Sequence, residues 1–320
     1  MTTGRPPRVA IVGARRVRTG LGQFFAKHLV AHGAEVPAFI ASRPETIDEG
    51  RASLRSVGVD AEGFVDLDAL LDAHPTVDAL VIATPHETHQ RWLEAAIGKG
   101  LHVLCEKPLV WGRPHPAQDA ETLMGMARHL KLVLFENCPW PYALPAFDAL
   151  HPRARADAIS TFEMEMAPAS TSTRSMLVDT LSHPLSVLQE LAPRGDAAIG
   201  SLRWEAVEAG RVELTFSFGQ AATRIAAAVR LRSVAGQPRP FGLVVNGFRA
   251  DRRIRMDDYA LSFVHGEREV PVADPMASLV KHFVDTVRQG EPPEAANVRM
   301  HRIAIRLRML EQIVGSFPGA

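Results

Sequence analysis

The first 137 residues alternate short apolar segments with segments of helix length, and this alternation restricts the fold more than any other feature. The runs Val9-Ala-Ile-Val12 and Asp78-Ala-Leu-Val-Ile-Ala83 are almost continuously apolar, which is typical of strands buried on both faces. Residues 21–32 and 87–98 carry helical periodicity between such runs. Strands joined by helices form parallel sheets with right-handed crossovers. The sequence therefore predicts a doubly wound α/β (Rossmann) domain over residues 1–137.

After Asn137 the expected strands follow one another with few helices between them. Residues 211–218 alternate polar and apolar side chains, as a half-exposed antiparallel strand does. The other expected strands are 159–166, 202–209, 224–232, 243–248 and 259–263, and the expected helices are 177–191, 275–288 and 298–314. This pattern predicts an α+β domain with an open, mainly antiparallel sheet over residues 138–320. Its last helix can pack back on the first domain.

Charge, apolar content and cysteine spacing indicate what kind of molecule the chain would bind. Lys+Arg and Asp+Glu both number 36, whereas nucleic-acid binders usually carry a basic excess. No apolar run approaches the ~18 residues of a membrane span, and the polar start does not read as a signal peptide. Cys105 and Cys138 have no metal-binding spacing and are expected to be reduced thiols. We therefore expect a cytoplasmic protein with a small-molecule partner, and neither nucleic acid nor membrane.

The turn after the first expected strand carries several glycines and arginines. It runs Gly13-Ala-Arg-Arg-Val-Arg-Thr-Gly20-Leu-Gly22 between a strand and a helix, where a dinucleotide fingerprint belongs. It departs from G-x-G-x-x-G because Arg15 stands at the second glycine position and the glycines are more widely spaced. A helix N-terminus still suits a phosphate, and Gly13, Arg15 and Arg16 are the expected cofactor ligands. The alternative is a solvated surface loop.

The residues at the end of the second expected strand indicate which dinucleotide, NAD(H) or NADP(H), the chain would bind. An acidic residue there binds the ribose of NAD, whereas an arginine accommodates the 2′-phosphate of NADP. The chain has Ser42 and Arg43 at this place, and its next acid is Glu45. A guanidinium forms a fork that fits phosphate, and a hydroxyl adds a hydrogen bond. NADP(H) is therefore the expected cofactor. NAD(H), with Arg43 as an ordinary surface residue, is the alternative.

Two further turns close strands at the same expected edge of the sheet. Thr84-Pro85-His86 would lie beside the nicotinamide ribose, with His89 on the following helical turn. No third ligand is spaced to join His86 and His89 in a metal site, so no metal is expected. Leu104-Cys-Glu106-Lys107-Pro108 closes the next strand and places a carboxylate and an amine beside the cofactor. Taken alone, this Glu–Lys pair would equally fit an exposed loop.

Together these turns resemble the Gfo/Idh/MocA oxidoreductases, the family of glucose-fructose oxidoreductase and inositol dehydrogenase. The resemblance rests on Ala83-Thr84-Pro85 with His89, and on the stretch that contains Glu106-Lys107-Pro108. Far along the chain, Met176-Leu-Val-Asp179-Thr-Leu-Ser-His183-Pro is similar to the family's D-x-x-x-H helix. The order of elements agrees with this family over nearly the whole chain.

The resemblance implies a role for each matching side chain. It makes His183 the acid/base, Asp179 its partner or a substrate ligand, and Lys107 a donor that polarises the substrate. Thr84, Pro85, His86, His89, Glu106 and Lys107 would contact the cofactor. The i and i+4 positions of Asp179 and His183 place them on one helix face, from which they could point into a cleft between the domains. Imidazole transfers protons near neutral pH, and a carboxylate one turn away can orient it. An exposed helical pair is the alternative.

The chain also departs from the family at residues that would meet the substrate. Ser186 stands where a second carboxylate is common, and His86 stands where an asparagine is common. The proline-rich segment with Trp140 and Tyr142 replaces the usual polar entry to the second domain. Trp140 could stack on a sugar face or pack at the domain junction. Arg174 could bind an anionic group. Trp140, Tyr142 and Arg174 are the predicted substrate contacts.

These features predict an NADP(H)-dependent oxidoreductase. Hydride would pass between the nicotinamide and a carbonyl, hydroxyl or imine carbon of a sugar-like or cyclic molecule. A glycosidase with a tightly bound cofactor and a cofactor-sensing regulator are the rival functions. The open face of the C-terminal sheet is an expected oligomer surface, because an exposed sheet needs cover. The resemblance implies that the oligomer is a homodimer or homotetramer.

Overall fold

The computed structural model groups the chain into two compact units, which are described separately. It describes residues 4–15, 20–170, 172–192, 197–220 and 223–319. The first unit is Met1–Asn137 with Met276–Ala304, and the second is Cys138–Pro275 with Ile305–Ala320. Residues 276–304, which the sequence assigned to the second domain, therefore group with the first.

A six-stranded sheet of order β3-β2-β1-β4-β5-β6 forms the centre of the first unit, and its pairings are all parallel. Its strands are β1 (Val9–Val12), β2 (Ala38–Ile40), β3 (Glu62–Phe64), β4 (Ala79–Ile82), β5 (His102–Cys105) and β6 (Leu134–Glu136). Every residue of β1 and β4 is buried, as their apolar runs predicted. The strand order reverses between β1 and β4. In such sheets, ligands bind outside the carboxyl ends of the strands at this reversal.

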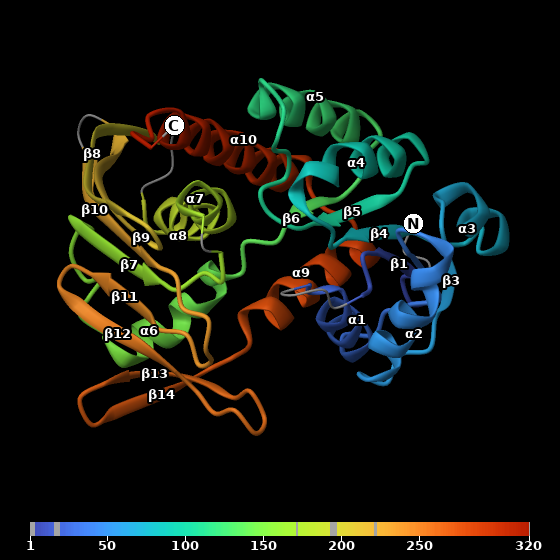
Figure 1. Cartoon of the computed structure of the whole chain (residues 1–320), viewed down its shortest axis with the longest axis horizontal. Helices are drawn as coiled ribbons and strands as arrows, with labels where there is room; N and C mark the ends of the chain where they lie inside the picture. The colour runs from blue at the N-terminus through green and yellow to red at the C-terminus, as the bar shows by residue number, and fades with distance from the viewer. Residues whose placement is uncertain (1–3, 16–19, 171, 193–196, 221–222, 320) are drawn as a thin grey trace. The chain divides into compact units, whose positions relative to one another are not determined.

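Helices cover both faces of this sheet, and this arrangement confirms the predicted doubly wound α/β class (Figure 1). Helices α4 and α5 lie on one face, and α1, α2 and α9 lie on the other. The bounds are α1 (Gly22–Ala31), α2 (Ile47–Arg55), α3 (Leu67–Ala73), α4 (His89–Gly98), α5 (Pro116–His129) and α9 (Pro275–Gln289), with 3₁₀ turns η1 (Pro44–Thr46) and η2 (His86–Thr88). Helix α9 is fixed by Phe283, whose ring meets Phe135 of β6 edge to face at 5.6 Å.

The second unit is built on an eight-stranded sheet of order β14-β13-β12-β11-β7-β10-β9-β8. Its pairings are antiparallel except for β7 with β10, which confirms the predicted open, mainly antiparallel sheet. The strands are β7 (Thr161–Met166), β8 (Ala198–Glu208), β9 (Arg211–Gln220), β10 (Thr223–Arg232), β11 (Phe241–Val245), β12 (Phe248–Ile254), β13 (Leu261–His265) and β14 (Arg268–Val272).

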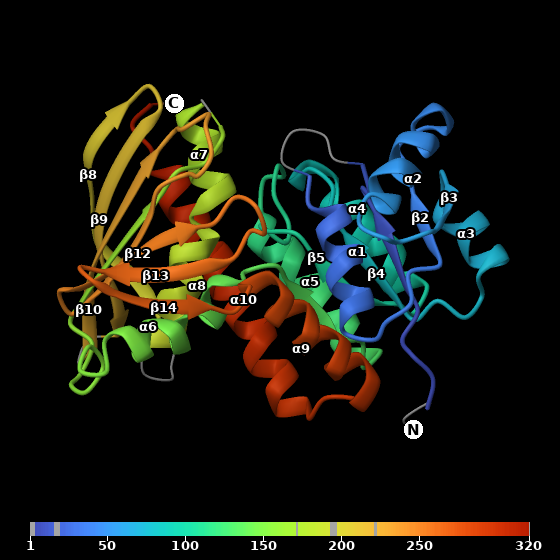
Figure 2. The same cartoon turned by 90° about the horizontal axis from the view of Figure 1, so that it is seen from below.

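Helices cover one face of the second sheet (Figures 1 and 2). They are η3 (Trp140–Ala143), α6 (Leu144–Leu150), α7 (Thr173–Thr180), α8 (Ser182–Leu191) and the second half of α10 (Pro293–Gly315). Strand β7 shows the difference between the faces, since Phe162 and Met164 are fully buried whereas Glu163 is exposed enough to pair with Arg230. The core of this unit lies between the sheet and the helices.

Two predicted elements of the second unit were wrong in detail. The expected strand 243–248 crosses a hairpin, because Asn246 and Gly247 adopt positive φ angles of 50° and 80° and turn the chain from β11 into β12. The expected helix 177–191 is divided into α7 and α8 at Leu181, whose backbone remains helical. Pro184 explains the division, because proline has no N–H to donate back along the helix.

Among the described segments, every helix falls short of the length or apolar content needed to span a bilayer.

Candidate functional site

Two glycines allow the chain to pass closely over the carboxyl edge of the first sheet. Gly13 follows β1 with φ +88°, and a Cβ on it would stand 2.6 Å from the carbonyl oxygen of Ala83. Gly22 opens α1, and a Cβ on it would collide with the carbonyl oxygen of Gly13. The turn and the close helix–strand approach are the two uses that a dinucleotide fold makes of its first and last fingerprint glycines. The wider spacing in the sequence therefore leaves both glycine functions in place.

Of the two arginines predicted to bind the cofactor in this turn, the structure describes Arg15. Arg15 donates from Nη1 to Glu49 Oε2 of α2 at 2.8 Å. This pair is partly exposed, and such pairs contribute only about 0–1 kcal/mol, so a phosphate can compete for the guanidinium. Arg16 lies outside the described residues. Its predicted role stays a prediction.

Ser42 and Arg43 lie between β2 and the 3₁₀ turn η1, which begins at Pro44. Thr46 fixes this turn by donating from Oγ1 to the carbonyl oxygen of Arg43 at 2.9 Å, and the Ser42 hydroxyl lies 3.4 Å from Thr46 Oγ1. Both Ser42 and Arg43 are exposed. Among the described residues no carboxylate pairs with the Arg43 guanidinium, in contrast to Arg15. A hydroxyl and a fork of donors stand together here, and this donor set suits a phosphate monoester.

His89 joins the turn after β4 to the turn after β5. It is fully buried in the first turn of α4. Its Nδ1 lies 2.9 Å from the carbonyl oxygen of Pro108, and its Nε2 lies 2.8 Å from the carbonyl oxygen of Thr84. Thr84 also accepts at Oγ1 from Thr88 at 2.7 Å. His89 thus holds together the two turns that the sequence placed beside the nicotinamide, although it was predicted only as a cofactor contact.

The protonation of His89 is under opposing influences. A neutral imidazole carries one N–H, so donating to two carbonyl oxygens requires the charged form. Burial lowers the pKa of His89, whereas the carbonyl groups of Pro108 and Thr84 and the nearby Glu106 carboxylate raise it, and burial has the larger effect. Removing either carbonyl contact would leave a buried polar group without a partner, which costs about 1–3 kcal/mol.

Glu106 is fixed by a residue that sequence reasoning did not assign to the site. Asn137, at the end of β6, donates from Nδ2 to Glu106 Oε1 and from its backbone N–H to the carbonyl oxygen of Cys105 at 2.8 Å. Protein atoms surround the Glu106 carboxylate, and this burial raises its pKa in spite of Lys107 and Asn137, which lower it. Asn137 ends a strand at the same sheet edge, and that position was the signal available in the sequence.

Lys107 follows Glu106 in this anchored turn and is half-buried. The peptide bond between Lys107 and Pro108 is cis. The next residue is also held, since Leu109 donates its backbone N–H to Glu136 Oε1 of β6 at 2.8 Å. Hydrogen bonds thus fix the turn on both sides of the lysine.

In the second unit, Asp179 and His183 lie on either side of the junction between α7 and α8. Leu181 donates to Leu177 and Leu185 donates to Leu181, so the helical path continues through the junction. Asp179 and His183 are both half-buried, whereas Leu181 between them is fully buried. The predicted i, i+4 relation is therefore kept, although the two residues belong to separate helices.

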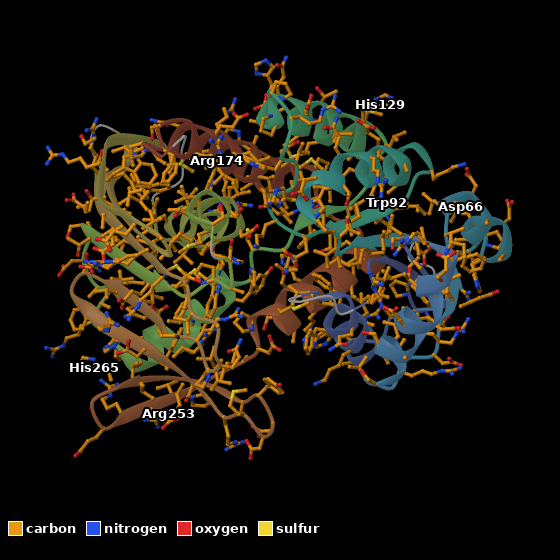
Figure 3. All side chains as sticks on the ribbon, viewed as in Figure 1. Asp66, Trp92, His129, Arg174, Arg253 and His265 are labelled. Carbon is orange, nitrogen blue, oxygen red and sulfur yellow. The ribbon has the colours of Figure 1, made fainter. Side chains whose placement is uncertain are left out.

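The predicted substrate residues Trp140, Tyr142 and Arg174 also lie in the second unit. Trp140 and Tyr142 belong to η3, which packs against α8. The Trp140 ring stacks on Phe241 with centroids 3.9 Å apart and an angle of 18° between the rings. One face of Trp140 is therefore taken by packing. Arg174 is exposed in the first turn of α7 (Figure 3).

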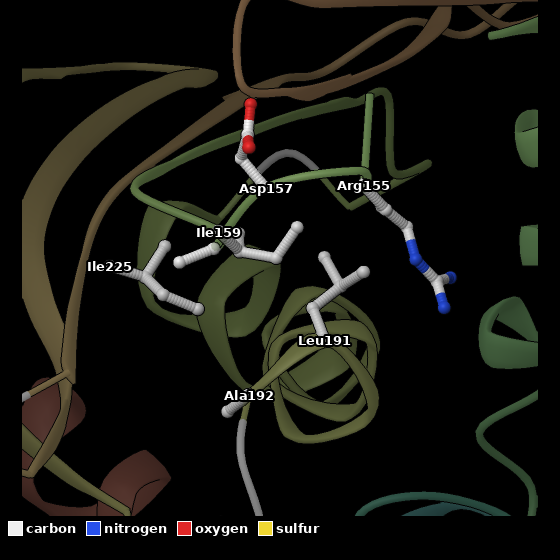
Figure 4. A pocket seen from close by; sticks show the side chains of 7 residues that line it. Arg155, Asp157, Ile159, Leu191, Ala192 and Ile225 are labelled. Atoms are coloured by element: carbon white, nitrogen blue, oxygen red, sulfur yellow. The ribbon is translucent and has the colours of Figure 1, made fainter. Parts of the chain in front are cut away.

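A cavity of about 330 Å³ lies in the second unit, away from these residues. Ile159, Leu191 and Ile225 point into it, and Arg155 and Asp157 stand at its side (Figure 4). None of the residues predicted to bind cofactor or substrate lines this cavity. In the part of the chain that the structure describes, no cluster of His, Cys, Asp and Glu is arranged to hold a metal ion.

Comparison with known proteins agrees with this geometry. Residues 7–138 match the Gfo/Idh/MocA family model, described as an oxidoreductase family with an NAD-binding Rossmann fold. An inositol 2-dehydrogenase of Leifsonia xyli subsp. xyli is 39% identical over 114 residues, which cover 34% of this chain and 30% of that protein. A dTDP-3,4-didehydro-2,6-dideoxy-alpha-D-glucose 3-reductase of Streptomyces antibioticus is 38% identical over 108 residues, which cover 32% of this chain and 31% of that protein. The matching segment thus spans about a third of these curated relatives.

Solved structures extend the likeness to both units. An inositol dehydrogenase homolog from Azotobacter vinelandii, complexed with NAD⁺, gives a TM-score of 0.70 at 19% identity, covering 98% of this chain and 95% of that one. A UDP-N-acetylglucosamine 3-dehydrogenase from Acidithiobacillus ferrooxidans gives 0.66 at 22% identity, covering 95% and 96%. At such identities the likeness shows a shared fold.

The glycine turn, the anchored strand ends and the sheet order give the first unit a Rossmann architecture, in agreement with the fold that the matching family model describes. Over residues 7–138, less than half of its length, the chain is similar to the Gfo/Idh/MocA oxidoreductase family.

Proposed function

We propose that the protein is an NADP(H)-dependent oxidoreductase of a sugar-like or cyclic small molecule. The observation that carries this proposal is the convergence of three turns on one sheet edge. Gly13, Thr84 and Glu106 follow β1, β4 and β5, which are neighbouring parallel strands at the reversal of strand order. The relatives named for inositol and for a dTDP-linked sugar support a polyol or sugar substrate.

Each turn would have its own task in this reaction. When bound, the dinucleotide supplies a hydride donor or acceptor. Gly13 and the start of α1 leave room for its pyrophosphate, and Ser42 with Arg43 would hold a 2′-phosphate. Glu106, kept in place by its amide partner, would accept a hydrogen bond from a ribose hydroxyl.

Two side chains would handle charge and protons on the substrate. Lys107 would donate to the substrate oxygen and stabilise negative charge that develops there. His183 would give a proton to that oxygen in reduction and take it in oxidation, with Asp179 orienting the imidazole. Proton transfer by a positioned side chain typically contributes about 10²–10⁴-fold to the rate.

The cofactor preference is tested by Arg43→Ala. A charge-assisted hydrogen bond contributes about 1.5–3 kcal/mol, so the variant should bind NADPH roughly 10- to 100-fold more weakly. Binding of NADH should change little, because NADH lacks the 2′-phosphate. Arg55→Ala is the matched control, since Arg55 is an exposed arginine of the same unit that pairs with Asp60. Equal loss of NADPH and NADH affinity would exclude a 2′-phosphate contact.

The reaction is tested by NADPH oxidation with panels of sugars, cyclic ketones and imines, and by NADP⁺ reduction with the matching alcohols. Lys107→Ala should lower kcat/KM about 10²-fold or more in either direction. Lys99→Ala is the control, because Lys99 is an exposed lysine of the same unit that pairs with Asp68. An unchanged rate in Lys107→Ala would remove this residue from the active site.

We propose in addition that copies of the chain associate through the open face of the second sheet. That face carries half-exposed ion pairs, among them Arg230 with Glu163 and Arg249 with Glu165. Alternating charges suit a polar interface between two copies related by a two-fold axis. Sedimentation should give a dimer or tetramer, and Arg230→Glu should weaken it by placing two carboxylates side by side. A monomeric wild-type protein would contradict this proposal.

A further inference from the structure

Arg252 lies on the helix-covered face of the second sheet, where its neighbours are apolar. Side chains alternate between the faces of a strand. Ala250, two residues before Arg252 on β12, is fully buried. Phe263 of β13, which pairs with Arg252 across the sheet, is fully buried as well. The Arg252 guanidinium carbon lies 5.3 Å from the ring centroid of Phe241 and 5.6 Å from that of Trp140. A cation therefore stands beside an aromatic stack.

Among the described residues, no carboxylate forms an ion pair with Arg252. Its Nη2 donates to the backbone carbonyl oxygen of Arg239 at 2.7 Å, and its Nε is buried without a hydrogen-bond partner among the described residues. The charge of the Arg239 side chain, a second cation, acts on Arg252 as well. Burial, and then the charge of Arg239, lower the pKa of Arg252 to about 10, and no carboxylate acts in the opposite direction.

Arg239 is unpaired in the same way. It belongs to the segment between β10 and β11, is half-buried, and donates from Nε to the backbone carbonyl oxygen of Val234 at 3.1 Å. Within the described residues, no acidic side chain lies at ion-pair distance from it. The open face of the same sheet differs, because there Arg249 contacts both Glu165 and Asp251. What distinguishes Arg252 from Arg249 is that it is a cation on the covered face, held by a backbone carbonyl oxygen and aromatic rings.

We propose that Arg239 and Arg252, with the Trp140–Phe241 stack beside them, form a binding site for the phosphate or carboxylate group of a small molecule. An oxyanion would supply the missing counter-charge, and the two guanidinium groups can each offer it a fork of donors. Trp140 is half-exposed and would give the rest of the ligand an apolar contact. The site uses residues of the second unit alone, so it does not depend on the proposed redox activity.

Titration calorimetry on the full chain tests the site with inorganic pyrophosphate, glucose 6-phosphate and glucuronate, and with glucose as the neutral probe. Because phosphates can also bind the glycine turn of the first unit, variants are compared. Arg252→Met should weaken binding of at least one charged probe about tenfold or more, as expected for a lost charge-assisted hydrogen bond. Arg253→Met is the matched control. Arg253 is the next residue of β12, points to the other face and pairs with Glu269.

A second variant keeps the proposal testable if Arg252→Met does not fold. Arg239→Ala removes a half-buried side chain whose Nε donates to a backbone carbonyl oxygen, and it should weaken binding of the same probe. The proposal is overturned if both variants bind every charged probe as tightly as Arg253→Met does. It is also overturned if the wild-type protein binds no charged probe more tightly than glucose.

The source of the oxyanion is decided by a further comparison. If the anion is part of a substrate, Arg252→Met should raise KM for charged substrates about tenfold or more and leave KM for neutral ones unchanged. If it belongs to a separate effector, probe binding should fall while both KM values stay the same. The calorimetric result stands whichever is found, and it stands even if the protein turns over none of these compounds.

Discussion

Replacing His89 by leucine should destabilise the first unit more than any other single histidine replacement there. Leucine has a similar volume but no donor, so the carbonyl oxygens of Thr84 and Pro108 would lose their contacts at 2.8 and 2.9 Å. Because His89 is fully buried, water cannot replace it at these oxygens. Because burial favours the neutral imidazole, which has one N–H, His89 donates to one of these two oxygens; the buried carbonyl that loses this donor costs about 1–3 kcal/mol, so the free energy of unfolding should fall by about 1–3 kcal/mol.

Thermal unfolding followed by calorimetry measures this loss. For a unit of this size, about 1 kcal/mol corresponds to roughly 2–4 °C, so a loss of about 2 kcal/mol, the middle of the range, lowers Tm by roughly 4–8 °C. His129→Leu is the control, since His129 is exposed at the end of α5 (Figure 3) and should shift Tm by little. If the two variants melted at the same temperature, the proposed clamp between the two turns would be refuted.

The same variant has a functional consequence. His89 holds Pro108, which follows Lys107, so its loss should free the turn that carries the lysine. At temperatures where the variant remains folded, kcat should fall although His89 has no proposed contact with the substrate. A folded variant with full activity would show that Lys107 does not need this clamp.

Three further predictions concern the first unit. Burial lowers the pKa of His89 and His102 below the ordinary value of 6.5, so the unfolded chain binds more protons than the folded chain between the lowered pKa and 6.5. Urea unfolding should therefore show stability that rises between about pH 5 and 7, and a flat profile would contradict these shifts. Gly22→Ala should cost about 1–3 kcal/mol and weaken dinucleotide binding, because the new Cβ meets the turn after β1. Gly125→Ala in α5 has open space and should instead stabilise by about 0.5–1 kcal/mol, so equal denaturation midpoints would argue against the close approach. Asn137→Leu removes the amide that donates to a buried carboxylate and should cost about 1.5–3 kcal/mol, while an unchanged midpoint would show that the carboxylate finds another donor.

How well the sequence predicted each element depended on how strongly that element is buried. Strands β1 and β4 are buried on both faces, so their apolar runs are visible without any knowledge of their neighbours. Strand β3 is three residues long and partly exposed, and so short a segment carries no period. The turn between β11 and β12 was missed for a different reason, because its Asn246-Gly247 signal was present and was included in a strand.

The candidate site shows the same division between local and long-range information. The sequence located Thr84, Glu106 and Lys107 correctly at strand ends, because the end of an apolar run is a local feature. It did not reveal that Asn137 holds Glu106 across 31 positions of the chain. It also left open whether Trp140 packs or binds, and packing against Phe241 now occupies one of its faces.

The sequence alone therefore determined the class of each unit and the strand ends that carry the proposed chemistry, since periodicity and chain order report the burial of a residue directly. Only the tertiary structure decided which groups meet: His89 with two carbonyl oxygens, Asn137 with Glu106, and Arg252 with Arg239 rather than with an acid. Such pairings depend on where separate elements come to rest against each other. These contacts are set by the packing of many elements in a unit, so no single segment of the sequence predicts them.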